Sequence, residues 1–503
     1  MCCIQLDALE QGASEVLCLI RSWRNRLAPV NRIPPEILAL IPDFWNRYRD
    51  SIRQDVIALT HVYRAWREVF VVRSSLWANL DCRHKDQARV YLERSMSLPV
   101  EFSLYAADVP FPYHPLFGII PRAIGQLGSL SIEAKHGDLQ DIIAHLSHPA
   151  PLLGELSIRG KFSDVTPHYP VLAPTLFNGD LSSLRKLCLD FVRTELPWRS
   201  MVNLTSFRLV YASPGEVSVS RLLDFFESAP FLRDIGLRDA GHHGVGLPFT
   251  TQTPGVQGGR LVSLGCLERM EIADDRSTPL LLDNMLIPVG AHSIIEVDLP
   301  SPPIMSHPPR FLDNLRNFPD FTTISLSCDW RLHIQFSGPN GQVKMIPRAS
   351  RVDRTCLVLQ SLGQFDTSNI ERLAIYYGNP PSGDPPYRAL LPMKHLRTLS
   401  LNQCENPHIF VHALHPSASS SGGIVCPKLE TLVIVLNGTT LDMKMVIGVA
   451  AARASGGAKL KSVRIPGRNK LVRADVLELK KHVFHVECGP EFSGANDDID
   501  KEV

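Results

Sequence analysis

A short apolar pattern recurs along most of the chain after residue 110. The pattern is apolar-x-x-apolar-x-apolar; it first occurs at Leu127-Leu130-Ile132 and last at Leu460-Val463-Ile465. Twelve such hexads can be traced, and most start-to-start spacings fall between 26 and 35 residues. The last two apolar positions are two residues apart, so on a strand they point to the same side. Each hexad therefore predicts one short strand that is buried on one side.

Helical segments precede several of the predicted strands. Residues 141–147 lead into Leu153, and residues 222–227 and 443–453 come before two later hexads. Helix, break and strand in this order are typical of an α/β repeat. The pattern resembles that of leucine-rich repeats, and predicts an irregular leucine-rich-repeat-like solenoid over residues 111–488. The alternative is a mixed α/β domain with one conventional sheet.

The hexads depart from regular leucine-rich repeats. The usual Asn or Cys three residues after the last apolar position is present at Asn437 and Cys404, but most hexads lack it. The register is least secure in residues 327–369, where 330–336 alternates like a strand and a turn follows at 338–341. The number of repeats in that interval stays open.

Residues 31–80 have a helical pattern instead. Asn31 can cap a helix and Pro34 and Pro35 suit its first turn, because a first-turn residue needs no N–H. A second helix is predicted from Asp55 to Phe70. Its apolar positions recur three and four residues apart and form a single stripe: Val56, Leu59, Val62, Tyr63, Trp66, Val69 and Phe70.

This helical stretch resembles the F-box. The family pattern runs Leu-Pro-x-Glu-Ile-Leu, then Val-Cys-Arg-x-Trp-Arg, then Leu-Trp. The chain has Ile33-Pro34-Pro35-Glu36-Ile37-Leu38, then Val62-Tyr63-Arg64-Ala65-Trp66-Arg67, then Leu76-Trp77. The three blocks occur in the family's order. The whole pattern is similar to F-box proteins of mushroom-forming fungi.

The resemblance implies a partner, since F-boxes bind the Skp-type adaptor of cullin-based ubiquitin ligases. Carried over by position, the adaptor-binding residues are Pro34, Pro35, Ile37, Leu38, Ile41, Leu59, Val62, Trp66 and Trp77. The alternative is that these side chains only form the core of the module. Two departures bear on this choice: Tyr63 stands where the family has cysteine, and residues 45–54 lengthen the first gap.

The predicted strands suggest a surface for a target protein. Residues between the buried positions of each strand point out of the sheet. The candidate target-binding residues are Arg208, Glu271, Asp298, Ser325, Ser400 and Arg464. They are mixed in sign, so they indicate no single class of charged ligand. The alternative is that they are ordinary solvated strand residues.

The flanking segments complete the expected organisation. Apolar residues in 1–30 predict an amphipathic helix, which could pack on the F-box or mediate self-association; the pattern leaves both open. The F-box covers 31–80 and a connecting segment covers 81–110. After the array, residues 489–503 are predicted to be a disordered acidic tail.

Composition and charge narrow the function. The 503 residues carry 52 basic and 51 acidic side chains, a net charge of +1, which provides no overall field for nucleic acid or an anionic membrane. Eleven scattered cysteines show no C-x-x-C spacing, as expected in a reducing compartment. No secretory signal and no apolar run of about 18 residues is present, so the prediction is a cytoplasmic or nuclear protein.

Catalytic and ligand-binding motifs are absent from the sequence. There is no G-x-x-x-x-G-K-[ST], G-x-G-x-x-G, H-E-x-x-H or G-x-S-x-G pattern, and His242-His243 have no further ligand at metal spacing. The sequence therefore predicts no cofactor, no metal and no catalytic residue. We expect a substrate-receptor subunit of a ubiquitin ligase that binds an adaptor, a cullin through it, and an unknown target. A repeat scaffold without ligase assembly, and an enzyme or ligand-binding protein on an α/β fold, remain alternatives.

Overall fold

The computed structural model describes residues 2–488 apart from a series of short intervals. The intervals left out are 42–54, 82–84, 107–117, 162–168, 211–218, 239–259, 275–280, 300–310, 317, 329–331, 348–358, 360–361, 363–364, 379–384, 417–422, 437–440 and 467–471. The long first gap at 45–54, His242-His243 and the tail 489–503 thus lie outside the described residues. The chain forms two compact units, Met1–Leu204 and Thr205–Val503.

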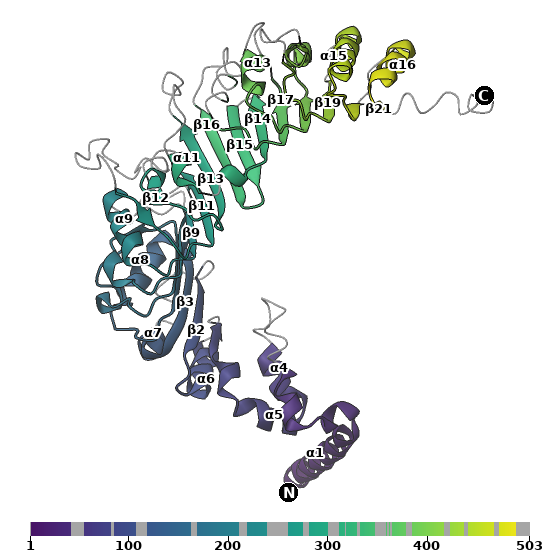
Figure 1. The fold of residues 1–503 in the computed structure, drawn as a ribbon. Helices are drawn as coiled ribbons and strands as arrows, with labels where there is room; N and C mark the ends of the chain where they lie inside the picture. The colour runs from purple at the N-terminus through teal and green to yellow at the C-terminus, as the bar shows by residue number, and fades with distance from the viewer. Residues whose placement is uncertain are drawn as a thin grey trace, which may run out of the picture. The chain divides into compact units, whose positions relative to one another are not determined.

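The first unit begins with helices (Figure 1). They are α1 (Cys2–Leu27), η1 (Pro29–Arg32), α2 (Pro35–Leu38), α4 (Asp55–Val62), α5 (Arg64–Val71), η3 (Ser74–Trp77) and α6 (Lys85–Ser95). Pro34 and Pro35 occupy the cap and first position of α2, as the pattern predicts. Asn31 does not cap this helix; its side-chain amide donates to the carbonyl of Asn25 over 2.8 Å.

The single helix predicted from Asp55 to Phe70 is wrong. The segment is two helices, because Tyr63 is extended (φ −158°, ψ 155°) and ends α4 before α5 begins. Arg67 stabilises the break: its Nε donates to the carbonyl of Thr60 over 2.9 Å, which satisfies an acceptor that the interrupted helix leaves open.

The strands of the first unit are parallel neighbours. They are β1 (Asn79–Asp81), β2 (Val100–Ala106), β3 (Leu127–Lys135), β4 (Glu155–Lys161) and β6 (Lys186–Asp190). Helix α8 (His136–Ala144) packs against β3 and β4 and buries Leu139 and Ile142. Two short strands, β5 (Val171–Leu172) and β7 (Arg193–Thr194), form a separate pair.

The second unit continues the strand-and-helix alternation. Its strands in the large sheet are β8 (Ser206–Val210), β9 (Asp234–Arg238), β11 (Arg269–Asp274), β13 (His292–Leu299), β14 (Thr323–Cys328), β15 (Leu332–Gly338), β16 (Gly341–Pro347), β17 (Arg372–Tyr376), β18 (Thr398–Asn402), β19 (Thr431–Val435), β20 (Ser462–Ile465) and β21 (His485–Cys488). A separate pair consists of β10 (Val262–Ser263) and β12 (Met285–Leu286).

The helices of the second unit lie along the same sheet. They are α9 (Val219–Ser228), α11 (Phe311–Asn314), α13 (Pro385–Leu390), α14 (Pro407–Ala413), α15 (Met443–Ser455) and α16 (Arg473–His482). Figure 1 shows α13, α15 and α16 on one side of the strands. The strands alternate accordingly: in β8, β18 and β19 every second residue is buried and the residues between are half-buried. The apolar hexad positions therefore face the helices and form the core.

The predicted leucine-rich-repeat-like solenoid is wrong. The fold is mixed α/β, and among the described residues seventeen strands belong to one large, mostly parallel sheet, which is the alternative left open by the sequence. Strand β15 is antiparallel to both β14 and β16, and β16 pairs with β13. The hairpin thus lies between β13 and β14. It forms because two alternating segments flank the tight turn at Gly338–Gly341, where Gly341 has φ +122° and lies against the backbone of Ser293.

One of the twelve hexads lies at Ile294-Val297-Leu299, and its first position is not in the core. Strand β13 places Ile295 beside the buried Ile272 of β11, and Ile295 is itself 1% exposed. Ile294 is half-buried on the other face. A run of apolar residues at 294, 295 and 297 supports two registers in sequence, and packing against β11 selects one.

Candidate protein-interaction surfaces

The residues predicted to bind an adaptor divide into buried and exposed groups. Leu38, Leu59, Trp66 and Trp77 are buried, with exposed fractions of 8% or less. Trp66 packs edge-on against Phe70 with ring centroids 5.8 Å apart. These four side chains lie in the core of the helical module.

Trp77 connects the module to the helix that follows. Its indole N–H donates to the carbonyl of Phe70 over 2.9 Å. The ring of Tyr91 packs edge-on against it at 4.9 Å, and the guanidinium carbon of Arg94 lies 4.4 Å from the ring centroid. A buried indole with its donor satisfied and a cation over its face is a stable anchor for η3.

The other predicted adaptor residues lie at the surface. Pro34 and Pro35 are exposed, Ile41 is half-buried, and Ile37 and Val62 have exposed fractions of 54% and 47%. Arg73 holds the end of α2 in place, because its guanidinium donates to the carbonyl of Ala39 directly after this helix.

Two exposed apolar residues were missed by the sequence pattern. Leu40 and Ile57 are 45% and 37% exposed. Neither residue belongs to the family blocks or to the apolar stripe, and Ile57 lies next to that stripe. An apolar residue outside an otherwise satisfied stripe is the signal that could have identified them.

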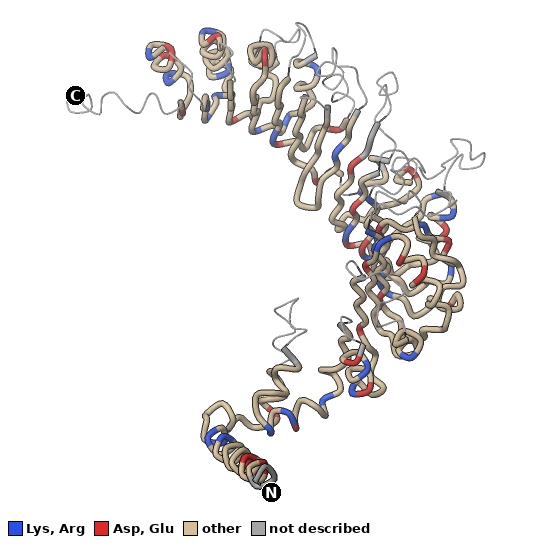
Figure 2. Tube along the Cα trace, turned by 180° about the vertical axis from the view of Figure 1, so that it is seen from behind, with Lys and Arg blue, Asp and Glu red and all other residues tan. Residues whose placement is uncertain are grey.

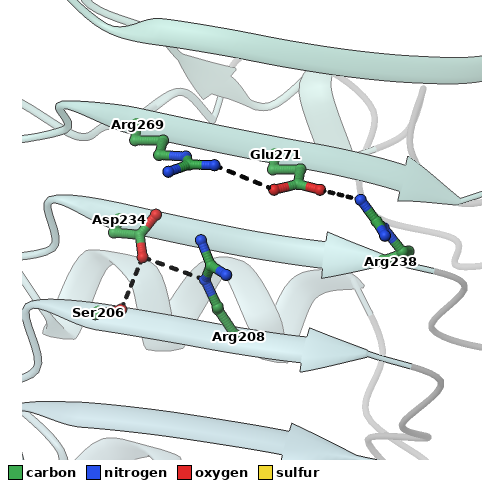
Figure 3. A network of polar contacts seen from close by, with 6 residues as sticks. All are labelled: Ser206, Arg208, Asp234, Arg238, Arg269 and Glu271. Atoms are coloured by element: carbon green, nitrogen blue, oxygen red, sulfur yellow. Dashed lines mark hydrogen bonds and ion pairs between the residues drawn. The ribbon is translucent and has the colours of Figure 1, made fainter. Parts of the chain in front are cut away.

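The second candidate surface is the face of β8, β9 and β11 that turns away from the helices. Ser206 Oγ donates to Asp234 Oδ2 over 2.9 Å, and Arg208 Nε lies 3.4 Å from the same oxygen (Figure 3). On the next strand Glu271 accepts from Arg238 and lies 3.7 Å from Arg269. The three strands thus carry a polar network of alternating charge.

Gly236 makes room for this network at its centre. It pairs with Arg208 on one side and with Glu271 on the other. A Cβ at this position would lie 2.9 Å from Arg208 Cγ, so the arginine stem passes over the glycine. The Arg208 side chain can therefore reach across β9 only because residue 236 has none.

Some hydrogen-bonding groups of the network remain available to a partner. Asp234 Oδ1 is buried and has no hydrogen-bond partner among the described residues. Arg238 and Arg269 are each about half exposed while both contact Glu271. Each guanidinium has five donors, so N–H groups remain for a partner. Exposed pairs of this kind contribute only about 0–1 kcal/mol, so they do little for stability.

The predicted target-binding residues are brought together only in part. Arg208 and Glu271 are both in the network on β8 and β11. Ser325, Ser400 and Arg464 lie on a common row of the sheet through Ala374 and Val433. Asp298 is on β13 but four residues beyond Ile294, which is the residue paired with Glu271; its side chain is not among those described.

Four residues of the network were not predicted. Ser206, Asp234, Arg238 and Arg269 lie two residues before or after the central outward position of their strands. The alternation of a strand places such residues on the same face. The hexads therefore contain the signal for these residues, at the outward positions on either side of the central one.

The first unit carries a similar network by itself. Arg159 of β4 contacts Asp190 of β6 over 3.0 Å and Glu133 of β3 over 3.4 Å. Lys161 also reaches Glu133, over 2.8 Å. Burial raises the pKa of Asp190 above its usual range, because desolvation outweighs the attraction of Arg159. Figure 2 shows acidic and basic residues interspersed along the strands.

No catalytic arrangement emerges from these groups. In the part of the chain that the structure describes, no three His, Cys, Asp or Glu side chains are placed to hold a metal ion. Among the same residues no helix has the length and apolarity to cross a membrane. Comparison with known proteins found no matching family model and no matching curated protein.

Proposed function

We propose that the chain is a non-catalytic substrate-receptor subunit of a Skp–cullin–F-box ubiquitin ligase. The helical module of residues 31–80 binds the Skp-type adaptor, and the open face of the sheet binds the target protein. The observation that carries this proposal is the coincidence of the F-box-like blocks with apolar residues left at the surface. Pro34, Pro35, Ile37 and Val62 belong to those blocks and are exposed.

The division between core and surface supports this role. A small helical module can spare few apolar residues from its own core. Here Leu38, Leu59, Trp66 and Trp77 supply the core, so Ile37 and Val62 are not needed for it. Large apolar side chains that a small module leaves exposed are typical of a protein-binding site.

The target side of the proposal rests on the network of β8, β9 and β11. Its half-exposed arginines and its carboxylates present both signs of charge over three adjacent strands. Such a face favours a partner with complementary charges and governs its orientation and rate of association. The receptor then contributes effective concentration, since it holds the target near the ubiquitin-conjugating machinery.

The test is co-purification of the full chain with a Skp-type adaptor, followed by size-exclusion chromatography. The wild type is expected to co-elute with the adaptor. Pro35→Asp and Ile37→Asp are expected to weaken the complex about 100-fold, because each buries a charge in an apolar contact. Val72→Asp is the matched control: Val72 is exposed in the same module, with an exposed fraction of 72%, but lies outside the F-box blocks.

Either of two results would contradict the proposal. One is a folded wild-type chain that elutes without the adaptor. The other is a complex that Val72→Asp weakens as much as Ile37→Asp does. The first result favours the second candidate function, a non-catalytic scaffold that binds proteins without assembling a ligase, and Tyr63 in place of the family's cysteine is the feature that supports it. The second result would show that the F-box blocks do not form the adaptor-binding site.

A further inference from the structure

Helix α1 leaves a complete apolar face at the surface. It is 26 residues long, which corresponds to about 39 Å. Every described side chain from residue 6 to residue 21 is exposed. Its large apolar residues have exposed fractions between 47% and 71%, and they are Leu6, Leu9, Val16, Leu17, Leu19, Ile20, Trp23 and Leu27.

The apolar residues of α1 follow a heptad pattern. Seven positions alternate at spacings of three and four residues without interruption: Leu6, Leu9, Ala13, Val16, Ile20, Trp23 and Leu27. A spacing that averages 3.5 residues is the seam of a two-helix coiled coil. Leu17 and Leu19 flank the seam at its middle, so the centre of the face is apolar across its full width.

The charges of α1 have a polarity along its length. Asp7, Glu10 and Glu15 lie in the first half, and Arg21, Arg24 and Arg26 lie in the second half. Figure 2 shows the acidic residues toward the N-terminal end of the helix and the basic ones toward the other end. Two such helices side by side in parallel would place like charges together. In the antiparallel direction each acidic half lies against a basic half.

We propose that two copies of this chain associate through α1 as an antiparallel helix pair. The pair is symmetric about residue 18. In this register Glu10 lies beside Arg24 of the partner subunit, and the wide Trp23 of the partner subunit faces the small Ala13. Val16 packs against Ile20 of the partner subunit, and Leu17 and Leu19 meet their own copies at the centre.

Size and charge are both complementary in this register. The bulkiest seam residue, Trp23, meets the smallest, Ala13, so the layers keep a constant width. Glu10 of each helix lies beside Arg24 of the partner subunit, so each pair of helices has two contacts between opposite charges. A parallel pair in register would stack Trp23 on Trp23 and Ala13 on Ala13, and would gain no Glu–Arg contact.

The association does not depend on the adaptor, so it is tested on the full chain alone by sedimentation equilibrium. The wild type is expected at twice the mass of one chain, which is 56.0 kDa. Ile20→Asp is expected to raise the dissociation constant about 100-fold or more, because it places a charge in the seam. Ser14→Asp is the control, since Ser14 lies outside the seam and its flanks. The dimer is excluded if the wild type has the mass of one chain at about 100 µM, which corresponds to an association free energy weaker than about −5.5 kcal/mol.

Charge reversal tests the direction of the helices. Glu10→Arg and Arg24→Glu are each expected to weaken the dimer roughly 3- to 10-fold, because each creates two contacts between like charges. The double variant is expected to restore wild-type affinity, because the opposite charges then meet again. If the double variant is as weak as the single variants, while far-UV circular dichroism shows an intact helix, the antiparallel arrangement is wrong.

Discussion

Two cysteines in the second unit are buried thiols. Cys404 and Cys426 are each 1% exposed, and the Cys426 thiol lies 3.3 Å from the carbonyl oxygen of Leu390. Burial raises the pKa of Cys404 to about 11 and that of Cys426 to about 12. Thiolates are the reactive form, so both side chains are unreactive at neutral pH. Their role is packing, since buried thiols behave as small apolar side chains.

The raised thiol pKa values predict a loss of stability at high pH. A free thiol in the unfolded chain titrates near about 8.5. The folded chain keeps both protons above that pH, so their stabilising effect is complete below it and declines as pH rises toward the folded pKa values. Between about pH 9 and 10.5 the free energy of unfolding should fall by on the order of 1 kcal/mol per pH unit for each thiol.

Urea unfolding of the wild type and of Cys404→Ala/Cys426→Ala at several pH values measures this effect. The difference in unfolding free energy between the two proteins should shrink as pH rises. Iodoacetamide at pH 8 should modify the exposed Cys18 and Cys266 but neither buried thiol. Rapid alkylation of Cys426 in the folded chain would contradict the assignment.

Core and surface roles could not be separated residue by residue from the sequence. Leu38 and Ile37 are adjacent and both apolar, yet one is 2% exposed and the other 54%. The F-box pattern requires an apolar residue at both positions. Only the packing of α2 against α5 determines which of the two faces inward.

At the scale of elements, a single arginine attaches α15 to the turn before β19. Arg453 is fully buried, and its two terminal nitrogens donate to the carbonyls of Val425 and Cys426 over 2.7 and 2.8 Å. Cys426 has φ +48°, so these bonds stabilise a strained turn. Burial lowers the pKa of Arg453, because desolvation disfavours the charged guanidinium, and the two carbonyls offset part of that cost.

Removing that attachment should destabilise the second unit. Arg453→Met keeps most of the length of the side chain but removes the donors to the carbonyls of Val425 and Cys426, and the Cys426 carbonyl then keeps only the N–H of Leu429. The free energy of unfolding should fall by about 2–4 kcal/mol. Urea unfolding followed by circular dichroism measures it, with Arg473→Met as the control because Arg473 is exposed on α16. Equal stability of the two variants would show that the Arg453 hydrogen bonds contribute little.

Element boundaries were predictable where periodicity is strong. The segment predicted to be helical at 443–453 is α15, and the one predicted at 222–227 lies within α9. The break at Tyr63 was not predictable in this way, because the apolar stripe passes through it without interruption. It depends on Arg67 and on contacts formed only in the folded module.

At the scale of the whole molecule, the sequence predicted strands better than the order in which they pair. Most hexads correspond to a strand of the large sheet, because alternation identifies strands directly. The placement of β15 and β16 between β13 and β14 was missed, since no local pattern specifies which edge a hairpin joins. That placement makes the fold a mixed sheet. The sequence predicted Arg208 and Glu271 as outward residues of β8 and β11. It did not predict the four other residues of the polar network that surround them.

Amide hydrogen exchange of the full chain, with and without a saturating Skp-type adaptor, tests the central claim most directly. The proposed function predicts slower exchange in peptides that cover 34–41 and 57–62, which contain the exposed residues Ile37, Leu40 and Val62. It predicts no change in the strands β8, β9 and β11, which are reserved for the target. Unchanged exchange in both helical segments at saturation, or protection confined to the sheet, would contradict it.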